Sequence, residues 1–332
     1  MLYDIRAYLN DVRTHLHLDP LTEKRVIGEL YTYFQEKIAE LRERGASETQ
    51  AANEAIKSFG GARSVARLMY EAHSRGTWYE AAITSLPHFL IASLFATHLW
   101  RNPVLVVLIS MLFVGVTLFG WWHSRPNWLF SWVGYSLFPL MIGGYLSYPT
   151  LEQTVLFLLG RQGSLPTIWA LLVTCTLFGS SLWIIISTTI RVVKRDWLLA
   201  SLMLVPIPVL ASWFFNIDQV GGLFRNTEAL YQWDVAMVSV LLLLGIASAT
   251  FIRLRRRLLK IGALITIGSI SLVMLGDNLW GDLGFTGMFV ISLSMLVFLL
   301  IPAMLEARLG HGEPEEDAWF DDWVEHPSMA RR

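Results

Sequence analysis

RLRRRLLK at residues 253–260 separates two long apolar runs, and a shorter basic stretch, RVVKRD, occupies residues 191–196. Short loops rich in Lys and Arg stay on the cytoplasmic side, because moving these charges across a bilayer is costly. The two stretches therefore predict an integral protein of the plasma (cytoplasmic) membrane that crosses the bilayer several times.

Composition and charge support this class. Of the 332 residues, 54% are hydrophobic and 16% are charged, which fits no soluble class. Residues 1–79 are neutral overall, residues 80–304 carry +4 and residues 305–332 carry −5. A neutral head argues against direct nucleic-acid binding, and the acidic tail argues against contact with anionic lipid. The single Cys175 excludes an internal disulfide and a thiolate metal site, and we expect no cofactor.

The apolar runs predict an all-α protein with about eight membrane spans. A helix needs roughly 20 apolar residues to cross a hydrocarbon core about 30 Å thick. The expected organisation is a cytoplasmic helical domain at 1–79, an eight-span domain at 80–304 and an acidic cytoplasmic tail at 305–332. The candidate spans are residues 81–100, 104–122, 128–148, 168–190, 197–215, 235–252, 261–279 and 285–304.

Loop charges orient these spans. With eight passes and the amino terminus inside, nine Lys and Arg residues fall in short inner loops and three fall in outer loops. This favours cytoplasmic positions for both termini. The alternative is that residues 81–122 hold one span and an interfacial segment, which would place both basic stretches outside.

Residues 1–75 predict a small bundle of helices. Apolar side chains recur every three or four positions at residues 2, 5, 9, 12 and 16 and again at 27, 30, 34, 38 and 41, so each helix has one apolar face. Asp19 and Pro20 are typical of a helix start, and Gly45 of a helix end. Ser47 and Gln50 predict a capping box that begins the next helix.

Four features of this segment occur in a fixed order: a proline-started helix with ELYTYF at 29–34, RGAS at 44–47, a helix over 48–59 and GGAR at 60–63. In this order the segment resembles the HAAS family, also described as the permease prefix domain. The resemblance implies a cytoplasmic helical module with a regulatory or signalling role. Members often occur beside PadR-like transcription regulators, so it also implies a link to such a system.

Ionisable residues within the spans are functional candidates, because their burial in lipid is costly. Asp277 and Asp282 form the best acidic pair for a cation or proton, with solvated turn residues as the alternative. His88 and His98 are ten positions apart on one expected span, so they cannot share a metal ion without another segment. Each histidine is instead a candidate for a proton or ligand role, with an ordinary interfacial histidine as the alternative.

Motifs of soluble catalysis are absent from the sequence, including H-E-x-x-H, the phosphate loop and G-x-S-x-G. We expect no enzyme and no catalytic residue; the less favoured alternative is an intramembrane enzyme whose catalytic residues are dispersed along the chain. The leading hypothesis is a nonenzymatic membrane regulator or accessory subunit whose head binds a cytoplasmic protein. A transporter or permease component is the alternative.

Two regions are candidates for partner binding. The first is the charged surface of the head, and the second is the tail, where three aromatic rings lie among seven acidic residues at 313–325. Such acidic and aromatic segments are typical of docking peptides, and residues 253–260 could receive this one within the same chain. The candidate residues are Glu36, Arg42, Arg44, Arg67, Trp319, Phe320 and Trp323.

The eight-pass topology predicts that positions 222 and 312 lie on opposite sides of the membrane. In a Cys175→Ala background, Gly222→Cys should react with a membrane-impermeant thiol reagent in intact cells, and Gly312→Cys should react only after permeabilisation. Equal labelling of both would refute eight passes. Labelling of position 312 alone would invert the orientation.

Overall fold

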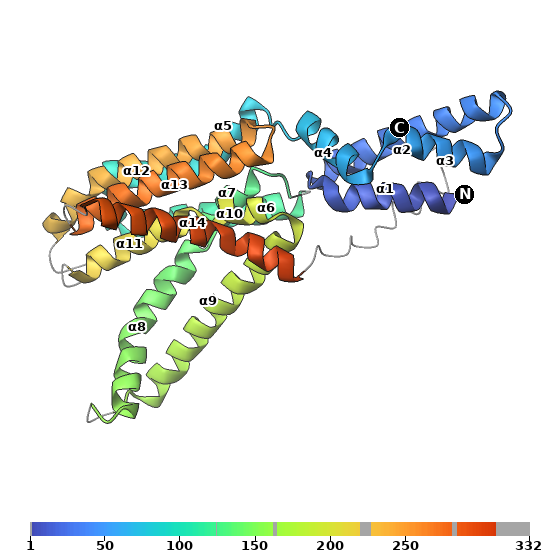
Figure 1. Cartoon of the computed structure of the whole chain (residues 1–332). Helices are drawn as coiled ribbons and strands as arrows, with labels where there is room; N and C mark the ends of the chain where they lie inside the picture. The colour runs from blue at the N-terminus through green and yellow to red at the C-terminus, as the bar shows by residue number, and fades with distance from the viewer. Residues whose placement is uncertain (1, 124, 162–164, 220–226, 281–283, 310–332) are drawn as a thin grey trace.

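The structure is a computed structural model that describes residues 2–123, 125–161, 165–219, 227–280 and 284–309. Throughout these ranges the regular secondary structure is helical, with no strand, which confirms the all-α prediction. Figure 1 shows a small group of helices, α1–α4, at one end of a larger group, α5–α14. The first group is called the head below.

The head is built from α1 (Leu2–Leu16), α2 (Pro20–Glu43), α3 (Glu48–Phe59) and α4 (Ala62–His73). The predicted helix signals are confirmed. The Asp19 side chain accepts a hydrogen bond from the Thr22 backbone N–H at the start of α2, and Ser47 and Gln50 form both halves of a capping box. Gly45 follows α2 with a φ of 92°, the left-handed region in which glycine has no steric penalty.

The predicted apolar stripes of the head meet in one core. Leu9, Val12 and Leu16 of α1 pack with Ile27 and Phe34 of α2, and small alanines from α3 and α4 complete the cluster. The Phe34 ring is fully buried and lies 4.4 Å from the Phe59 ring, measured between ring centres. Because both stripes are buried as the helical period requires, their assignment to inward faces is confirmed.

The larger group contains ten α-helices and one 3₁₀ turn in the described ranges. Five of the helices, α6, α9, α12, α13 and α14, are long and apolar enough to cross a membrane, and α7 with α8 would make a sixth as one bent span. These helices indicate a membrane protein that crosses the bilayer several times. The bounds are α5 (Trp78–Ala96), η1 (Leu99–Arg101), α6 (Pro103–Trp122), α7 (Leu129–Ser136), α8 (Phe138–Leu158), α9 (Ile168–Arg195), α10 (Trp197–Leu204), α11 (Pro206–Gln219), α12 (Thr227–Arg253), α13 (Arg257–Trp280) and α14 (Gly284–Leu309).

Two predicted spans each contain a pair of helices in the structure. The segment expected at 128–148 holds α7 and the first part of α8, and the one expected at 197–215 holds α10 and most of α11. Leu137 and Val205, between the paired helices, keep right-handed helical dihedral angles, so each pair runs on with little change of direction. A bend of 43° follows later, between Gly144 and Ser147 of α8.

Pro139 and Pro206 lie in the first turns of α8 and α11, where the missing N–H of proline is tolerated. The short helices α7 and α10 pack against each other in the core, and a Cβ atom on Gly134 would lie 2.3 Å from the Met203 carbonyl oxygen.

The remaining helices surround this centre. Helix α12 packs along α5 and beside α13, whereas α8 and α9 project together from the rest of the bundle (Figure 1). Large apolar side chains on the outer helices are exposed, among them Met111, Trp183 and Met304. Exposed apolar surface on long helices is expected where lipid, rather than water, surrounds the protein.

Replacing Phe34 with alanine should destabilise the head by about 3–5 kcal/mol, because the buried ring leaves a cavity. The measurement is the cooperative helical melt of residues 1–75, which we expect to fold without the membrane, followed by circular dichroism. Glu36→Ala is the control on the same helix, and its exposed side chain should change stability by less than about 0.5 kcal/mol. Equal effects of the two substitutions would argue against the described core.

Candidate functional site

A four-residue linker, Ser74–Thr77, joins the head to α5 and is hydrogen-bonded to the turn between α12 and α13. The Gly76 backbone N–H donates to the Ile252 carbonyl oxygen at 3.0 Å, and the Ser74 hydroxyl donates to the Arg255 carbonyl oxygen at 2.9 Å. Arg253 donates in return to the Gly76 carbonyl oxygen at 2.8 Å. Segments nearly 180 residues apart in sequence are therefore held together.

Gly76 permits this close approach. A Cβ atom at this position would lie 2.4 Å from Cγ2 of Ile252, closer than van der Waals contact allows. The next residues, Thr77 and Glu80, form a capping box in which each side chain accepts a hydrogen bond from the backbone of the other. The linker therefore passes directly from its contact with the turn into α5.

Beside the linker, the buried ammonium group of Lys260 joins the head to α13. Its side chain donates to the Tyr70 hydroxyl at 3.1 Å, and the residue is only 4% exposed. The rings of Tyr70 and Phe251 also lie about 5 Å from the ammonium nitrogen, within cation–π range. Burial, reinforced by the charge of Asp196, raises the pKa of Tyr70 well above its ordinary value, so the hydroxyl stays neutral.

Asp196 supplies the opposite charge. Its carboxylate caps α10 by accepting from the Leu198 N–H, and it accepts a 2.7 Å hydrogen bond from the Arg257 guanidinium. The charges of Asp196 and Arg257 also act on Glu306, near the end of α14. Tyr70, Asp196, Arg257, Lys260 and Glu306 are called the junction cluster, because they bring one head helix together with α10, α13 and α14.

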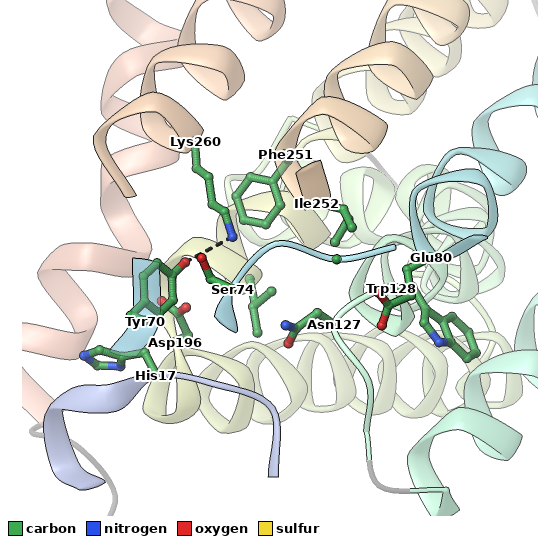
Figure 2. A pocket seen from close by; sticks show the side chains of 12 residues that line it. His17, Tyr70, Ser74, Glu80, Asn127, Trp128, Asp196, Phe251, Ile252 and Lys260 are labelled. Atoms are coloured by element: carbon green, nitrogen blue, oxygen red, sulfur yellow. Dashed lines mark hydrogen bonds between the residues drawn. The ribbon is translucent and has the colours of Figure 1, made fainter. Parts of the chain in front are cut away.

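A small cavity with both polar and apolar side chains in its lining opens beside the junction cluster (Figure 2). Its volume is about 20 Å³, on the order of one or two water molecules. The geometry is thus that of a buried connection between two groups of helices. Its lining comes from both sides of the linker and includes His17, Tyr70, Ser74, Asn127, Asp196 and Lys260.

A second polar cluster lies at the other end of α12. His98 and Trp100 both donate to Oδ2 of Asp234, whose side chain is 3% exposed. Arg101 donates to the Tyr231 hydroxyl, and the centres of the Tyr231 and His98 rings lie 4.2 Å apart.

Asp234 and Arg253 are 19 positions apart on α12, which corresponds to roughly 28 Å at 1.5 Å per residue. Helix α12 thus separates the Asp234 cluster from the linker contact at Arg253 by about one hydrocarbon thickness.

His88 is separate from both clusters. It is buried between α5, α7 and α12, with Ser131 at 3.5 Å from one ring nitrogen and Ser248 at 3.3 Å from the other. The Tyr135 ring packs edge-on against it at 5.1 Å. These contacts join three helices, the role that polar side chains often have between membrane helices. The described residues contain no group of three or more potential metal-ligating side chains.

The remaining predicted residues do not converge on one site. Glu36, Arg42, Arg44 and Arg67 are exposed on the head, and Arg44 pairs with Glu40. Asp277 belongs to the last turn of α13, but its side chain lies outside the described residues. The other predicted residues outside the described ranges are Asp282, Trp319, Phe320 and Trp323.

Sequence reasoning missed Tyr70, Asp196 and Asp234 as site residues. The position of Asp234 could have indicated a site residue, since it is an isolated acidic residue at the edge of an apolar run. The position of Asp196, between a basic loop and an expected span, is a weaker indication. The sequence around Tyr70 gives no such indication, because the role of Tyr70 depends on a lysine 190 positions away.

Comparison of the chain with protein-family models, with curated proteins and with solved structures finds no match.

Removing the Tyr70 hydroxyl should destabilise the full chain in detergent by about 1–3 kcal/mol, because buried Lys260 loses its hydrogen-bond acceptor. Tyr70→Phe, Lys260→Met and the double variant form a double-mutant cycle, measured by thermal unfolding. The expected coupling energy is about 0.5–3 kcal/mol.

Tyr79→Phe is the matched control, since Tyr79 is 74% exposed on the adjacent helix; it should leave the melting temperature unchanged. Additive effects of Tyr70→Phe and Lys260→Met would contradict a direct interaction between the two side chains.

Proposed function

We propose that the chain is a nonenzymatic integral membrane regulator or accessory subunit whose head binds a cytoplasmic protein. The observation that carries this proposal is the junction cluster, in which a head tyrosine accepts a hydrogen bond from a lysine buried at the start of α13. Partner binding that shifts α4 would move Tyr70 relative to Lys260. The membrane helices would then favour a different arrangement, which is the requirement for coupling between two regions.

The proposal includes the topology. Helices α5 and the α10–α11 pair would complete eight crossings in addition to α6, α7–α8, α9, α12, α13 and α14. Both basic stretches, and with them the head and the tail, would then face the cytoplasm. The junction cluster is consistent with this arrangement, because its basic residues lie at the ends of apolar helices.

The resemblance of residues 1–75 to the HAAS family supports a protein partner, with a PadR-like transcription regulator system as one candidate. The proposed contact surface is formed by exposed charged residues of the head. Charges of this kind steer association and contribute little to folding. The residues are Glu36, Arg42, Arg44 and Arg67.

A transporter component is the second candidate, favoured by the prolines inside two apolar segments of the core. Pro139 and Pro206 closely follow the buried helices α7 and α10 and remove a backbone hydrogen-bond donor there. Proline-interrupted apolar segments that meet inside a bundle occur in secondary transporters, where freed backbone groups contact the substrate or ions. In this function the head would be dispensable, and intramembrane charge would be essential.

The two functions are distinguished by charge reversal on the head. Full-length protein is purified with its associated proteins from its own membranes, before and after Glu36→Lys, Arg42→Glu, Arg44→Glu and Arg67→Glu are combined. The regulator hypothesis predicts loss of a specific cytoplasmic protein, with the helical circular dichroism spectrum unchanged. Lys57→Glu, an exposed charge reversal on α3, is the control that should retain this protein.

A transporter would give the opposite pattern. Ion or solute flux into proteoliposomes would continue without the head and fall when Asp277→Asn removes a charge from α13. Flux that depends on Asp277, with no protein retained through the head, would refute the regulatory function.

A further inference from the structure

Four arginines gather where the linker meets the α12–α13 turn. Arg75 belongs to the linker, and Arg253, Arg255 and Arg256 belong to the end of α12 and the turn. The hydrogen bonds between the two segments hold the linker against the turn, and the charges of Arg75 and Arg255 both act on Arg253. Arg256 is the next residue of the turn after Arg255. These four residues are called the arginine patch.

The arginine patch has no acidic partner in the described part of the chain. Arg75, Arg255 and Arg256 are exposed, and none of the four forms an ion pair with a described carboxylate. The nearby carboxylate of Glu80 instead accepts hydrogen bonds from Thr77 in the capping box. Like charges held together by the backbone repel one another, so this arrangement favours an anionic ligand.

Large apolar and aromatic side chains surround the patch. Trp78 and Tyr79 are each 74% exposed, and Leu258 is 81% exposed. The Arg253 guanidinium lies 4.2 Å from the centre of the Trp78 ring. These residues occupy the first turns of α5 and α13, and α13 continues as a candidate membrane span. Trp and Tyr beside basic residues at the end of a span are typical of the headgroup level of a bilayer.

We propose that the arginine patch binds the phosphate groups of anionic phospholipids. The planar guanidinium offers two parallel donors that match phosphate oxygens, and basic residues next to a span attract anionic headgroups. The acidic tail, residues 313–325, is the competing ligand within the chain. Lipid is favoured because Trp78, Tyr79 and Leu258 suit the interface between headgroups and acyl chains.

This proposal goes beyond the regulatory function, because it requires no protein partner. Anionic lipid would be a second ligand, besides the protein partner, that influences the regulatory function. Lipid bound at the arginine patch would contact the same linker that joins the head to α5, so membrane charge would act on the linker directly.

The test titrates the full-length protein in neutral detergent with phosphatidylglycerol or with phosphatidylcholine of identical acyl chains. Bound lipids are counted by native mass spectrometry, and thermal stability is recorded in parallel. Phosphatidylglycerol should bind more tightly and raise the melting temperature. The variant Arg75→Gln, Arg255→Gln, Arg256→Gln should bind it on the order of a hundredfold more weakly, since each arginine near the surface contributes about 1 kcal/mol. Arg253 is left in place because it also bonds to the linker.

A triple Lys variant at the same positions is the matched control, and it should retain most of the preference because it keeps the charge. Equal binding of the two lipids by the unaltered protein would overturn the proposal, as would full preference in the triple Gln variant. The same holds if preference appears only after the acidic residues at 313–325 are changed to amides, because the tail would then be the ligand.

Discussion

The buried ammonium of Lys260 is the constraint on which the arrangement of the head depends. A charge removed from water must be compensated by hydrogen bonds, opposite charge or aromatic rings. Lys260 obtains these from Tyr70 in the head, from the ring of Phe251 and from the charge of nearby Asp196. A head placed elsewhere would leave the ammonium without its acceptor, so the cost of burying this charge ties the position of α4 to the first turn of α13.

Helix α12 connects the region around the linker with polar contacts on the far side of the bundle. Its carboxyl end supplies the backbone carbonyl of Ile252 to the linker, and its amino-terminal part carries Asp234, which accepts from His98 and Trp100. Between these ends it packs along α5 and contributes Ser248 to the surroundings of His88. One continuous helix therefore makes polar contacts at several points along its length, through Asp234, Ser248 and Ile252.

The features that could be predicted from the sequence are those that depend on residues close together in the chain. The stripes ending in Leu16 and Leu41, the cap at Asp19 and the capping box at Ser47 follow from spacing and from neighbouring residues, and the structure confirms them. The course of the segments that hold α7 with α8 and α10 with α11 is harder to predict, because a proline near the middle of a span permits either a kink or a new helix. The partner of Lys260 was missed for a different reason. Hydrophobic spacing does not single out Tyr70 as a buried residue of α4, since Leu68 on the same helix is 58% exposed, and it does not show which distant helix covers Tyr70.

The contact between Gly76 and Ile252 limits how modular the head can be. A domain on a flexible tether can be exchanged between proteins with little regard to the tether, because many lengths satisfy the same connection. Here four residues connect two helices, and three hydrogen bonds fix their course. One inserted residue would displace the chain by about 3.3 Å and rotate α4 relative to the membrane helices. Chimeras that graft this head onto another membrane region would therefore need the linker, the turn and the lysine to be transferred as a single unit.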